Sequence, residues 1–167
     1  DVCAVPVLAH VDVVIIGGGT SGACAAIGAA RRGAEGLVVE YQEGLGGVGS
    51  LGLIGRPYHG QKLGFTKEVP FCDKEHNTEY KMEWYRTKIR TTGGKIWLRV
   101  LGCGAIVDGN VVKGVIVATP MGRGAILADV VIDATGNADI AVAAGAESMF
   151  GGDETDIALQ GTGLPQR

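Results

Sequence analysis

The sequence lacks several features that would each define a class of protein. Its four cysteines form no C-x-x-C pair, which argues against a zinc ribbon and a dithiol redox centre, and no metal site is predicted. No apolar run approaches the roughly 20 residues of a membrane-spanning helix, so we expect no membrane span. The net charge of −3 offers no basic patch, and nucleic acid is therefore not an expected partner.

A secretory signal peptide is not visible either, which leaves the cytoplasm as the default location. The chain begins at Asp1 without a methionine, and its last residue, Arg167, follows a stretch rich in Gly and Pro. We interpret it as a processed or excised piece of a longer protein. A signal peptide could have been removed with the missing part, so the compartment stays open.

Glycine, in contrast, is abundant. The 167 residues include 29 glycines, well above the usual share of roughly 7%. They follow no period and no low-complexity pattern, so we interpret them as tight turns and close backbone approaches. With 46% hydrophobic and 20% charged residues, the chain has an ordinary globular composition and is long enough for one well-buried domain.

The most informative motif follows a strand predicted over residues 11–16 and consists of Gly17, Gly18, Gly19, Thr20, Ser21 and Gly22. It has the G-x-G-x-x-G spacing. In this spacing the first glycine turns the chain, the second admits a pyrophosphate, and the third lets the following helix pack close to the strand. The Ala-rich segment 21–32 is the expected helix, and its free N-terminal amides would face the phosphate charge. The motif alone is weak evidence for a dinucleotide site.

An acid at the end of the next predicted strand strengthens the evidence for a dinucleotide site. Residues 36–40 (GLVVE) are predicted to form a second buried strand, which completes a βαβ unit within about 30 residues. Glu40 stands about 20 residues beyond the glycine turn, where a carboxylate can accept hydrogen bonds from ribose hydroxyls. Its charge would repel the 2′-phosphate of NADP. Tyr41, the next residue, is included in the expected site.

A second glycine-dense loop, Gly46-Gly47-Val48-Gly49-Ser50-Leu51-Gly52, follows this acid. A simple NAD-binding Rossmann domain does not need such a loop. The loop resembles that of the FAD-dependent oxidoreductases with the glutathione-reductase type of fold, because it fits their pattern Gly-Gly-x-x-Thr-x-Gly with Ser50 in place of Thr. The resemblance implies that Gly46, Gly47 and Ser50 lie along the pyrophosphate and ribitol of FAD.

The middle of the chain extends this resemblance. A helix is predicted over 78–92, with Asn77 or Thr78 as its N-cap, and a strand is predicted over 95–101. Three short antiparallel strands are predicted at 105–108, 111–119 and 125–128. The family carries such a β-meander as the crossover between its core strands.

A further buried strand, expected over 129–134, runs into Ala134, Thr135 and Gly136. This triplet matches the second signature of the family, where a strand ends against the FAD. The resemblance also implies that the backbone of Val100 brackets the adenine. A helix is expected over 140–145, with Asp139 near its N-terminus as a dipole partner and candidate cap.

We therefore predict an α/β, Rossmann-like FAD/NAD(P)-binding fold with a central parallel sheet and an inserted antiparallel β-meander. Residues 1–150 would be the N-terminal, incomplete part of an FAD-binding domain, and residues 151–167 a boundary loop or linker towards a missing substrate domain. The implied function is to hold the pyrophosphate and ribose of FAD for hydride or electron transfer in a flavin-dependent oxidoreductase. The expected partners are an unidentified small-molecule substrate and either a missing C-terminal segment or a partner subunit.

Two alternatives stay open. An NAD-dependent dehydrogenase with one Rossmann unit is compatible with Glu40 but does not require the second glycine loop or the meander. A non-catalytic nucleotide-binding subunit of a larger assembly would bind the dinucleotide without reducing a substrate. No catalytic residue is assigned: His59 and Cys72 lie in a long stretch without periodicity, and Cys24 is expected to pack in the core.

Overall fold

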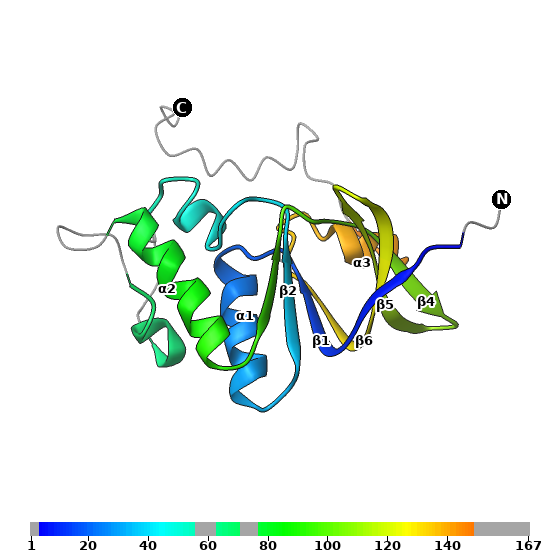
Figure 1. Ribbon diagram of the computed structural model, residues 1–167, viewed down its shortest axis with the longest axis horizontal. Coiled ribbons are helices and arrows are strands. Elements are labelled where there is room, and N and C mark those ends of the chain that lie inside the picture. The colour runs from blue at the N-terminus through cyan, green and yellow to red at the C-terminus, as the bar shows by residue number, and fades with distance from the viewer. Residues whose placement is uncertain (1–3, 56–62, 71–76, 149–167) are drawn as a thin grey trace.

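In the part of the chain that the structure describes, six strands form where the sequence has short apolar or alternating runs: β1 (Val7–Ile16), β2 (Gly36–Glu40), β3 (Lys95–Leu98), β4 (Leu101–Asp108), β5 (Val111–Thr119) and β6 (Gly122–Asp133). They make one sheet in the order β3-β2-β1-β6-β5-β4 (Figure 1). The structure is a computed structural model that describes residues 4–55, 63–70 and 77–148.

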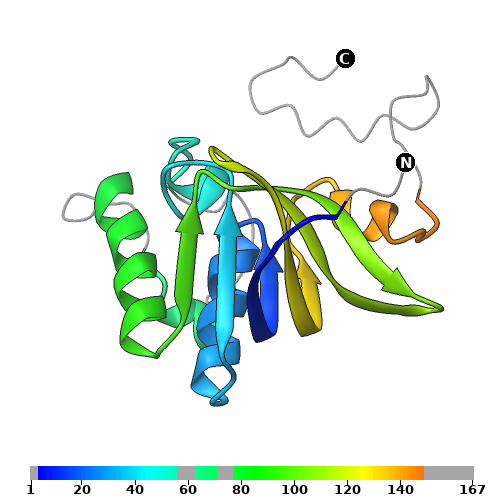
Figure 2. The same ribbon diagram turned by 45° about the vertical axis from the view of Figure 1, so that its right-hand side comes forward.

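The sheet has a parallel and an antiparallel part. Strand β1 pairs in parallel with β2 and with β6, and β2 pairs in parallel with β3. Strand β5 pairs antiparallel with β4 and β6. The predicted α/β fold, with a central parallel sheet and an antiparallel meander, is therefore confirmed. Because β1, β2, β3 and β6 run the same way, their carboxyl ends meet at one edge of the sheet (Figure 2).

Helices α1 (Thr20–Arg31) and α2 (Thr78–Thr91) cover one face of the parallel strands (Figure 1). Side chains alternate between the two faces of a strand, so Ile15 points towards these helices and packs in a cluster with Ile27 and Tyr85. Helix α2 starts as predicted, since the side chain of its N-cap Asn77 accepts a hydrogen bond from the N–H of Tyr80 at 2.8 Å.

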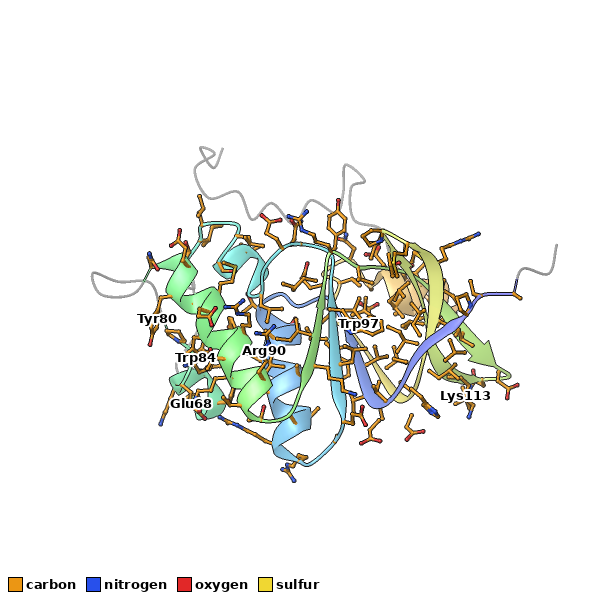
Figure 3. The ribbon with its side chains drawn as sticks, viewed as in Figure 1. Glu68, Tyr80, Trp84, Arg90, Trp97 and Lys113 are labelled. Atoms are coloured by element: carbon orange, nitrogen blue, oxygen red, sulfur yellow. The ribbon has the colours of Figure 1, made fainter. Side chains whose placement is uncertain are left out.

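The opposite face packs against the meander strands. Val14 and Leu37 belong to a buried cluster that includes Val115 and Val117 of β5. Trp97, on β3, packs against this cluster (Figure 3). The parallel strands are thus covered on both faces, which explains why their sequences are continuously apolar rather than alternating.

Two predicted strands prove to be one. The meander strand expected at 125–128 and the core strand expected at 129–134 are both parts of β6. Residues 122–127 pair with β5, whereas residues 125–133 pair with β1. A single long strand therefore passes from the antiparallel part of the sheet to the parallel part, and the expected boundary between the two strands was wrong.

Three other boundaries also differ from the prediction. The strand expected over 95–101 stops at Leu98, because Arg99 adopts a left-handed φ of 59°. Strand β1 begins at Val7, before the predicted start at Val11, since its first residues pair with β6. Helix α3 (Asp139–Ala143) starts one residue earlier and ends two residues earlier than expected.

None of the helices in the described ranges is long and apolar enough to cross a membrane. Residues 151–167, which we expected to form a boundary loop or linker, lie outside the described residues. That expectation, and the division of the chain at residue 150, stay predictions.

Candidate functional site

The four parallel strands end around a cavity of about 780 Å³. Ligands of open parallel α/β sheets bind in this place, outside the carboxyl ends of the strands. Most of the predicted site residues line the cavity: Gly17, Gly19, Thr20, Ser21, Glu40, Tyr41, Gly47, Val100, Ala134, Thr135 and Gly136. The fold thus brings together segments that are more than one hundred residues apart in the sequence.

The three glycines of the G-x-G-x-x-G motif differ in what surrounds them. Gly17 has a φ of +95°, and a Cβ on it would lie 2.3 Å from the carbonyl oxygen of Ala134. A Cβ on Gly22 would lie 1.8 Å from the carbonyl oxygen of Gly17. A Cβ on Gly19, in contrast, would have only Gly47 Cα at 4.0 Å, and Gly19 lines the cavity. The first and third glycines therefore permit close packing, and the second leaves open space for a ligand.

The N-terminus of α1 opens onto the same cavity. Gly19 is the N-cap, no side chain caps the helix, and the first turn contains no acid. A helix end in this state presents backbone N–H groups and the positive end of the helix dipole. These N–H groups and the positive helix end suit a phosphate group, so the residues present fit the pyrophosphate of a dinucleotide.

Glu40 is buried at the end of β2, with 7% of its surface exposed. Its Oε2 accepts a hydrogen bond from the N–H of Gly18 at 2.6 Å, and its Oε1 accepts one from the N–H of Gln42 at 2.6 Å. A carboxylate can accept about four hydrogen bonds, so two backbone donors leave capacity for two hydroxyl groups of a ligand. Glu40 also lines the cavity, where such a ligand would reach it.

Hydrogen bonds hold the second glycine loop, at 46–52, against the glycine turn at 17–22. The N–H of Gly46 donates to the carbonyl oxygen of Gly18 at 2.8 Å, and the hydroxyl of Thr20 donates to the carbonyl oxygen of Gly46 at 3.0 Å. A Cβ on Gly47 would lie 3.0 Å from Gly19 Cα, and the φ of Gly47 is +53°. Glycine at this position lets the two loops lie against each other.

Four predicted site residues do not line the cavity but lie in the segments that form it: Gly18, Gly22, Gly46 and Ser50. Ser50 is buried, and its hydroxyl donates to the carbonyl oxygen of Leu45 within its own loop. The contact that we expect between Ser50 and FAD stays a prediction.

Asp133, the last residue of β6, is a residue that sequence reasoning missed. Its Oδ1 accepts hydrogen bonds from the N–H and the hydroxyl of Thr135 at 3.0 and 2.7 Å. Its Oδ2 accepts from the N–H groups of Ile140 and Ala141 at 2.9 and 2.8 Å, at the start of α3. The Asp133 side chain therefore caps the first turn of this helix. Asp139, the candidate cap, makes no capping hydrogen bond, but it lies in the first turn, where we expected it as a dipole partner. The sequence feature that could have indicated this role is an acid two residues before Thr135, a spacing typical of Asx turns.

These hydrogen bonds also set the charge state of Asp133. Burial acts to raise the pKa of the Asp133 carboxyl, but the bonds from Thr135, Ala141 and Ile140 outweigh it and hold the pKa below the ordinary value. The group is therefore a carboxylate at neutral pH. It fixes the turn at 134–136 from behind the cavity wall.

One further wall residue, Thr66, lies in a segment for which we made no structural prediction. Arg31 and Glu68 hold this segment against α1 through two side-chain hydrogen bonds of 2.9 and 2.7 Å. The Arg31 guanidinium also lies 4.9 Å from the ring centre of Phe65, which in turn packs against Trp84 of α2. Figure 3 shows Glu68 and Trp84 on neighbouring elements.

The described residues supply no assigned catalytic group. His59 and Cys72 lie outside them. Cys24 of α1 packs near Tyr85, with Sγ 3.9 Å from the phenol oxygen, and burial raises the pKa of its thiol. It also lines the cavity, which core packing alone did not predict. Within the described ranges, no three His, Cys, Asp or Glu side chains are grouped so that they could hold a metal ion.

Comparison with known proteins bears on the family and on the fold. The model of the family described as FAD dependent oxidoreductase matches residues 12–69 and 58–164 of the chain. A comparison with curated protein sequences gave no significant match.

Among solved structures, the chain is similar to THI4 from Thermovibrio ammonificans, with a TM-score of 0.60 and 21% identity over 80% of this chain and 61% of that one. It is similar to a geranylgeranyl bacteriochlorophyll reductase-like protein from Thermoplasma acidophilum, with a TM-score of 0.61 and 19% identity over 83% and 43% of the two chains. It is also similar to L-proline dehydrogenase from P. horikoshii, with a TM-score of 0.57 and 24% identity over 81% and 24%. These likenesses show the fold, and the chain spans less than two thirds of each of these structures.

Proposed function

Because this chain belongs to the family of FAD dependent oxidoreductases, we propose that the cavity at the carboxyl ends of its parallel strands holds the pyrophosphate and ribose of FAD for hydride or electron transfer. FAD is the cofactor of this family, and the chain carries the corresponding FAD-binding fold. When bound, the isoalloxazine ring of FAD supplies the redox chemistry. The part left to this chain is to bind and orient the cofactor.

Each segment of the cavity wall has a role in this proposal. The glycine turn at 17–22 receives the pyrophosphate at the N-terminus of α1, and the carboxylate of Glu40 accepts the ribose hydroxyls. Tyr41 and Val100 close the side on which we place the adenine; the N–H of Val100 donates to the carbonyl oxygen of Glu40 at 3.0 Å. The loop at 46–50 and the turn at 134–136 extend the wall towards the ribitol.

The observation that carries the proposal is the convergence of these segments. The turn at 17–22, the acid at 40, the loop at 46–50 and the turn at 134–136 were selected from sequence signatures alone. The fold places lining residues from all four on one cavity. A chain that matched the signatures by chance would not be expected to bring them to the same edge of its sheet.

We further propose that the complete protein is an enzyme that oxidises or reduces an unidentified small molecule, and that another segment or a partner subunit completes its site. The edge of β6 supports this second part. Residues 125–133 pair with β1, but beyond residue 127 no strand in the described ranges pairs with the other edge of β6, and Val130 is 50% exposed. An open edge inside a mostly buried sheet is a place for a further strand.

Two measurements test the proposal against its alternatives. Denaturing the purified full-length protein and identifying the released nucleotide separates flavin from nicotinamide, so release of NAD would favour a dehydrogenase with one Rossmann unit. Dye-coupled turnover by the intact protein or assembly separates an enzyme from a non-catalytic subunit. Turnover that depends on FAD supports an oxidoreductase, whereas bound FAD without turnover over a broad substrate panel supports a nucleotide-binding subunit.

A further inference from the structure

Residues 63–70 form a short segment that supplies part of the cavity wall. The segment contains one turn of 3₁₀-helix, η2 (Gly64–Lys67). The hydroxyl of Thr66 fixes the shape of this turn, because it accepts a hydrogen bond from the N–H of Leu63 at 2.8 Å and donates one to the carbonyl oxygen of Leu63 at 2.6 Å. Thr66 is also the residue of the segment that lines the cavity. Such a short turn has few hydrogen bonds of its own, so its position in the wall depends on the groups that anchor it.

Arg31, in the last turn of α1, anchors the segment on both sides of Thr66. Its Nη1 and Nη2 donate to the two carboxylate oxygens of Glu68 at 2.9 and 2.7 Å. The same guanidinium lies 4.9 Å from the centre of the Phe65 ring. A planar guanidinium suits both contacts, the bidentate one with a carboxylate and the stacked one with an aromatic ring. The hydrogen bond from Arg31 also lowers the pKa of the Glu68 carboxyl, so the pair is charged at neutral pH.

Apolar contacts hold the rest of the segment. The ring centre of Phe65 lies 6.4 Å from that of Trp84 on α2. Val69 is only 6% exposed and belongs to the buried cluster that contains Ile27 of α1 and Ile89 of α2. The segment is therefore attached to both helices, and the contacts of Arg31 determine how the part around Thr66 lies against α1.

Cys24 shows that the cavity reaches towards this segment. It lies one turn beyond the first residue of α1, lines the cavity, and packs on the same buried cluster as Phe65. The cavity thus continues from the N-terminus of α1 along the side of the helix, where Thr66 forms part of its wall. Burial raises the pKa of the Cys24 thiol, so the thiol should react slowly as long as the segment stays in place.

We propose that Arg31 is a positioning residue which, by binding Glu68 and covering Phe65, holds Thr66 in the cavity wall and closes the cavity along the side of α1 around the bound FAD. This inference rests on the proposed function. Arg31 itself does not line the cavity, so it acts through the segment 63–70 and not on the cofactor. Exposed ion pairs contribute little to the stability of a whole domain. Removal of Arg31 should therefore loosen the segment while the domain stays folded.

The test compares four variants of the full-length protein with the wild type. Arg31→Gln removes the guanidinium, Glu68→Gln removes the charge that it binds, and a double variant combines the two changes. Lys95→Gln is the matched control, because it breaks another exposed ion pair, that of Lys95 on β3 with Glu35. The urea midpoint of each variant shows whether the fold is retained.

Two rates are then measured. The first is the dissociation of FAD after dilution, followed by flavin fluorescence. The second is the alkylation of Cys24 by iodoacetamide in the apo protein, followed by mass spectrometry of the peptide that contains it, so that the other cysteines do not interfere. The alkylation rate reports on the segment without FAD, and the dissociation rate reports on closure around FAD.

We expect Arg31→Gln to accelerate both rates about fivefold, and Glu68→Gln about threefold, since Arg31 keeps its contact with the Phe65 ring in the second variant. The double variant should behave like Arg31→Gln, because without Arg31 the carboxylate has no partner to lose. The effect of Glu68→Gln should shrink at high salt, which screens an exposed ion pair. Lys95→Gln should leave both rates unchanged, and every variant should keep a urea midpoint close to that of the wild type.

The outcomes separate the two proposals. If the wild type takes up no FAD, the proposed function fails and this inference fails with it. If the wild type binds FAD but neither rate rises in Arg31→Gln, or both rise equally in Lys95→Gln, only the inference is overturned. Faster alkylation of Cys24 without faster dissociation of FAD would also overturn it, because the segment would then not close the cavity around the cofactor. If Arg31→Gln lowers the urea midpoint, the comparison of Glu68→Gln with Lys95→Gln decides in the same way.

Discussion

The carboxylate of Glu40 accepts a hydrogen bond from the backbone N–H of Gly18 across 2.6 Å. This bond joins the end of β2 to the turn that follows β1, and the second oxygen of Glu40 holds the N–H of Gln42. The acid therefore has two tasks. It fixes the shape of the glycine turn, and it presents its remaining acceptor capacity to the cavity, where we propose that the ribose binds.

Glu40→Gln should weaken both the fold and the binding of FAD. The side-chain amide has the same shape but only one accepting oxygen, so one of the two backbone donors loses its partner. We expect a loss of about 1–3 kcal/mol in the free energy of unfolding and a fall in FAD affinity of about tenfold or more. Urea unfolding and titration of the folded apo protein with FAD measure the two effects. Glu43→Gln, at an exposed acid three residues away, is the control, and equal FAD affinity in both variants would contradict the role of Glu40.

Two alanine substitutions should separate the structural glycines from the one that faces the ligand. Gly17→Ala meets the carbonyl oxygen of Ala134 and needs a positive φ, so we expect it to destabilise the fold by about 1–3 kcal/mol or more. Gly19→Ala meets open space, so its stability should stay within about 0.5 kcal/mol of the wild type. Its methyl group would nevertheless occupy the space in the cavity where we place the pyrophosphate, and it should lower FAD affinity about tenfold or more.

Thermal unfolding and FAD titration test this pair together. The prediction fails if Gly19→Ala binds FAD as the wild type does, or if Gly17→Ala is as stable as the wild type.

Asp133→Asn should destabilise the turn at 134–136. The substitution removes one of two accepting oxygens, each of which holds two donors, so we expect a loss of about 2 kcal/mol at pH 7. The pKa of Asp133 is lowered in the folded state. Its stabilisation is therefore fully present above the unfolded value of about 3.9 and is lost as the pH falls through the lower folded value.

Urea unfolding of the wild type and Asp133→Asn between pH 7 and pH 3 measures this dependence. The difference between the two should be constant down to about pH 5 and should shrink below about pH 4. Asp129→Asn, exposed on the same strand, is the control and should change little. A difference that grew towards acid pH would contradict the assignment.

The open edge of β6 makes a prediction about the chain by itself. If another segment or a partner subunit pairs with this edge and completes the site, the purified 167-residue chain should carry little flavin. A longer protein that contains the chain should be yellow. Absorbance spectra of the two preparations, scaled to protein concentration, make the comparison. Stoichiometric flavin on the 167-residue chain would show that its site is already complete.

The local signatures predicted the elements around the cavity because each depends on neighbouring residues. The strand and turn at 13–22 and the strand that ends at Glu40 need only the order of apolar residues, glycines and an acid. The continuity of β6 could not be predicted in the same way, since it depends on pairing with β5 at one end and with β1 at the other.

The directions of individual side chains could not be predicted from the sequence either. Ser50 turns into its own loop, where its hydroxyl bonds to the carbonyl oxygen of Leu45 and lies only 2.6 Å from where a Cβ on Gly46 would be. The burial of Lys81 depends on how α2 packs across the second glycine loop, more than thirty residues away in the sequence. These details arise from contacts between distant segments, which no local pattern records.

The central claim is that the glycine turn, Glu40 and the turn at 134–136 together hold FAD. The most direct test is to denature the purified full-length protein, identify the released nucleotide by mass spectrometry and count it against the protein. We predict FAD at one molecule per chain, and less than this in the Gly19→Ala protein isolated at the same free FAD concentration, because its affinity for FAD should be about tenfold lower or more. Release of NAD, or of no nucleotide from a protein that also fails to take up added FAD, would contradict the claim.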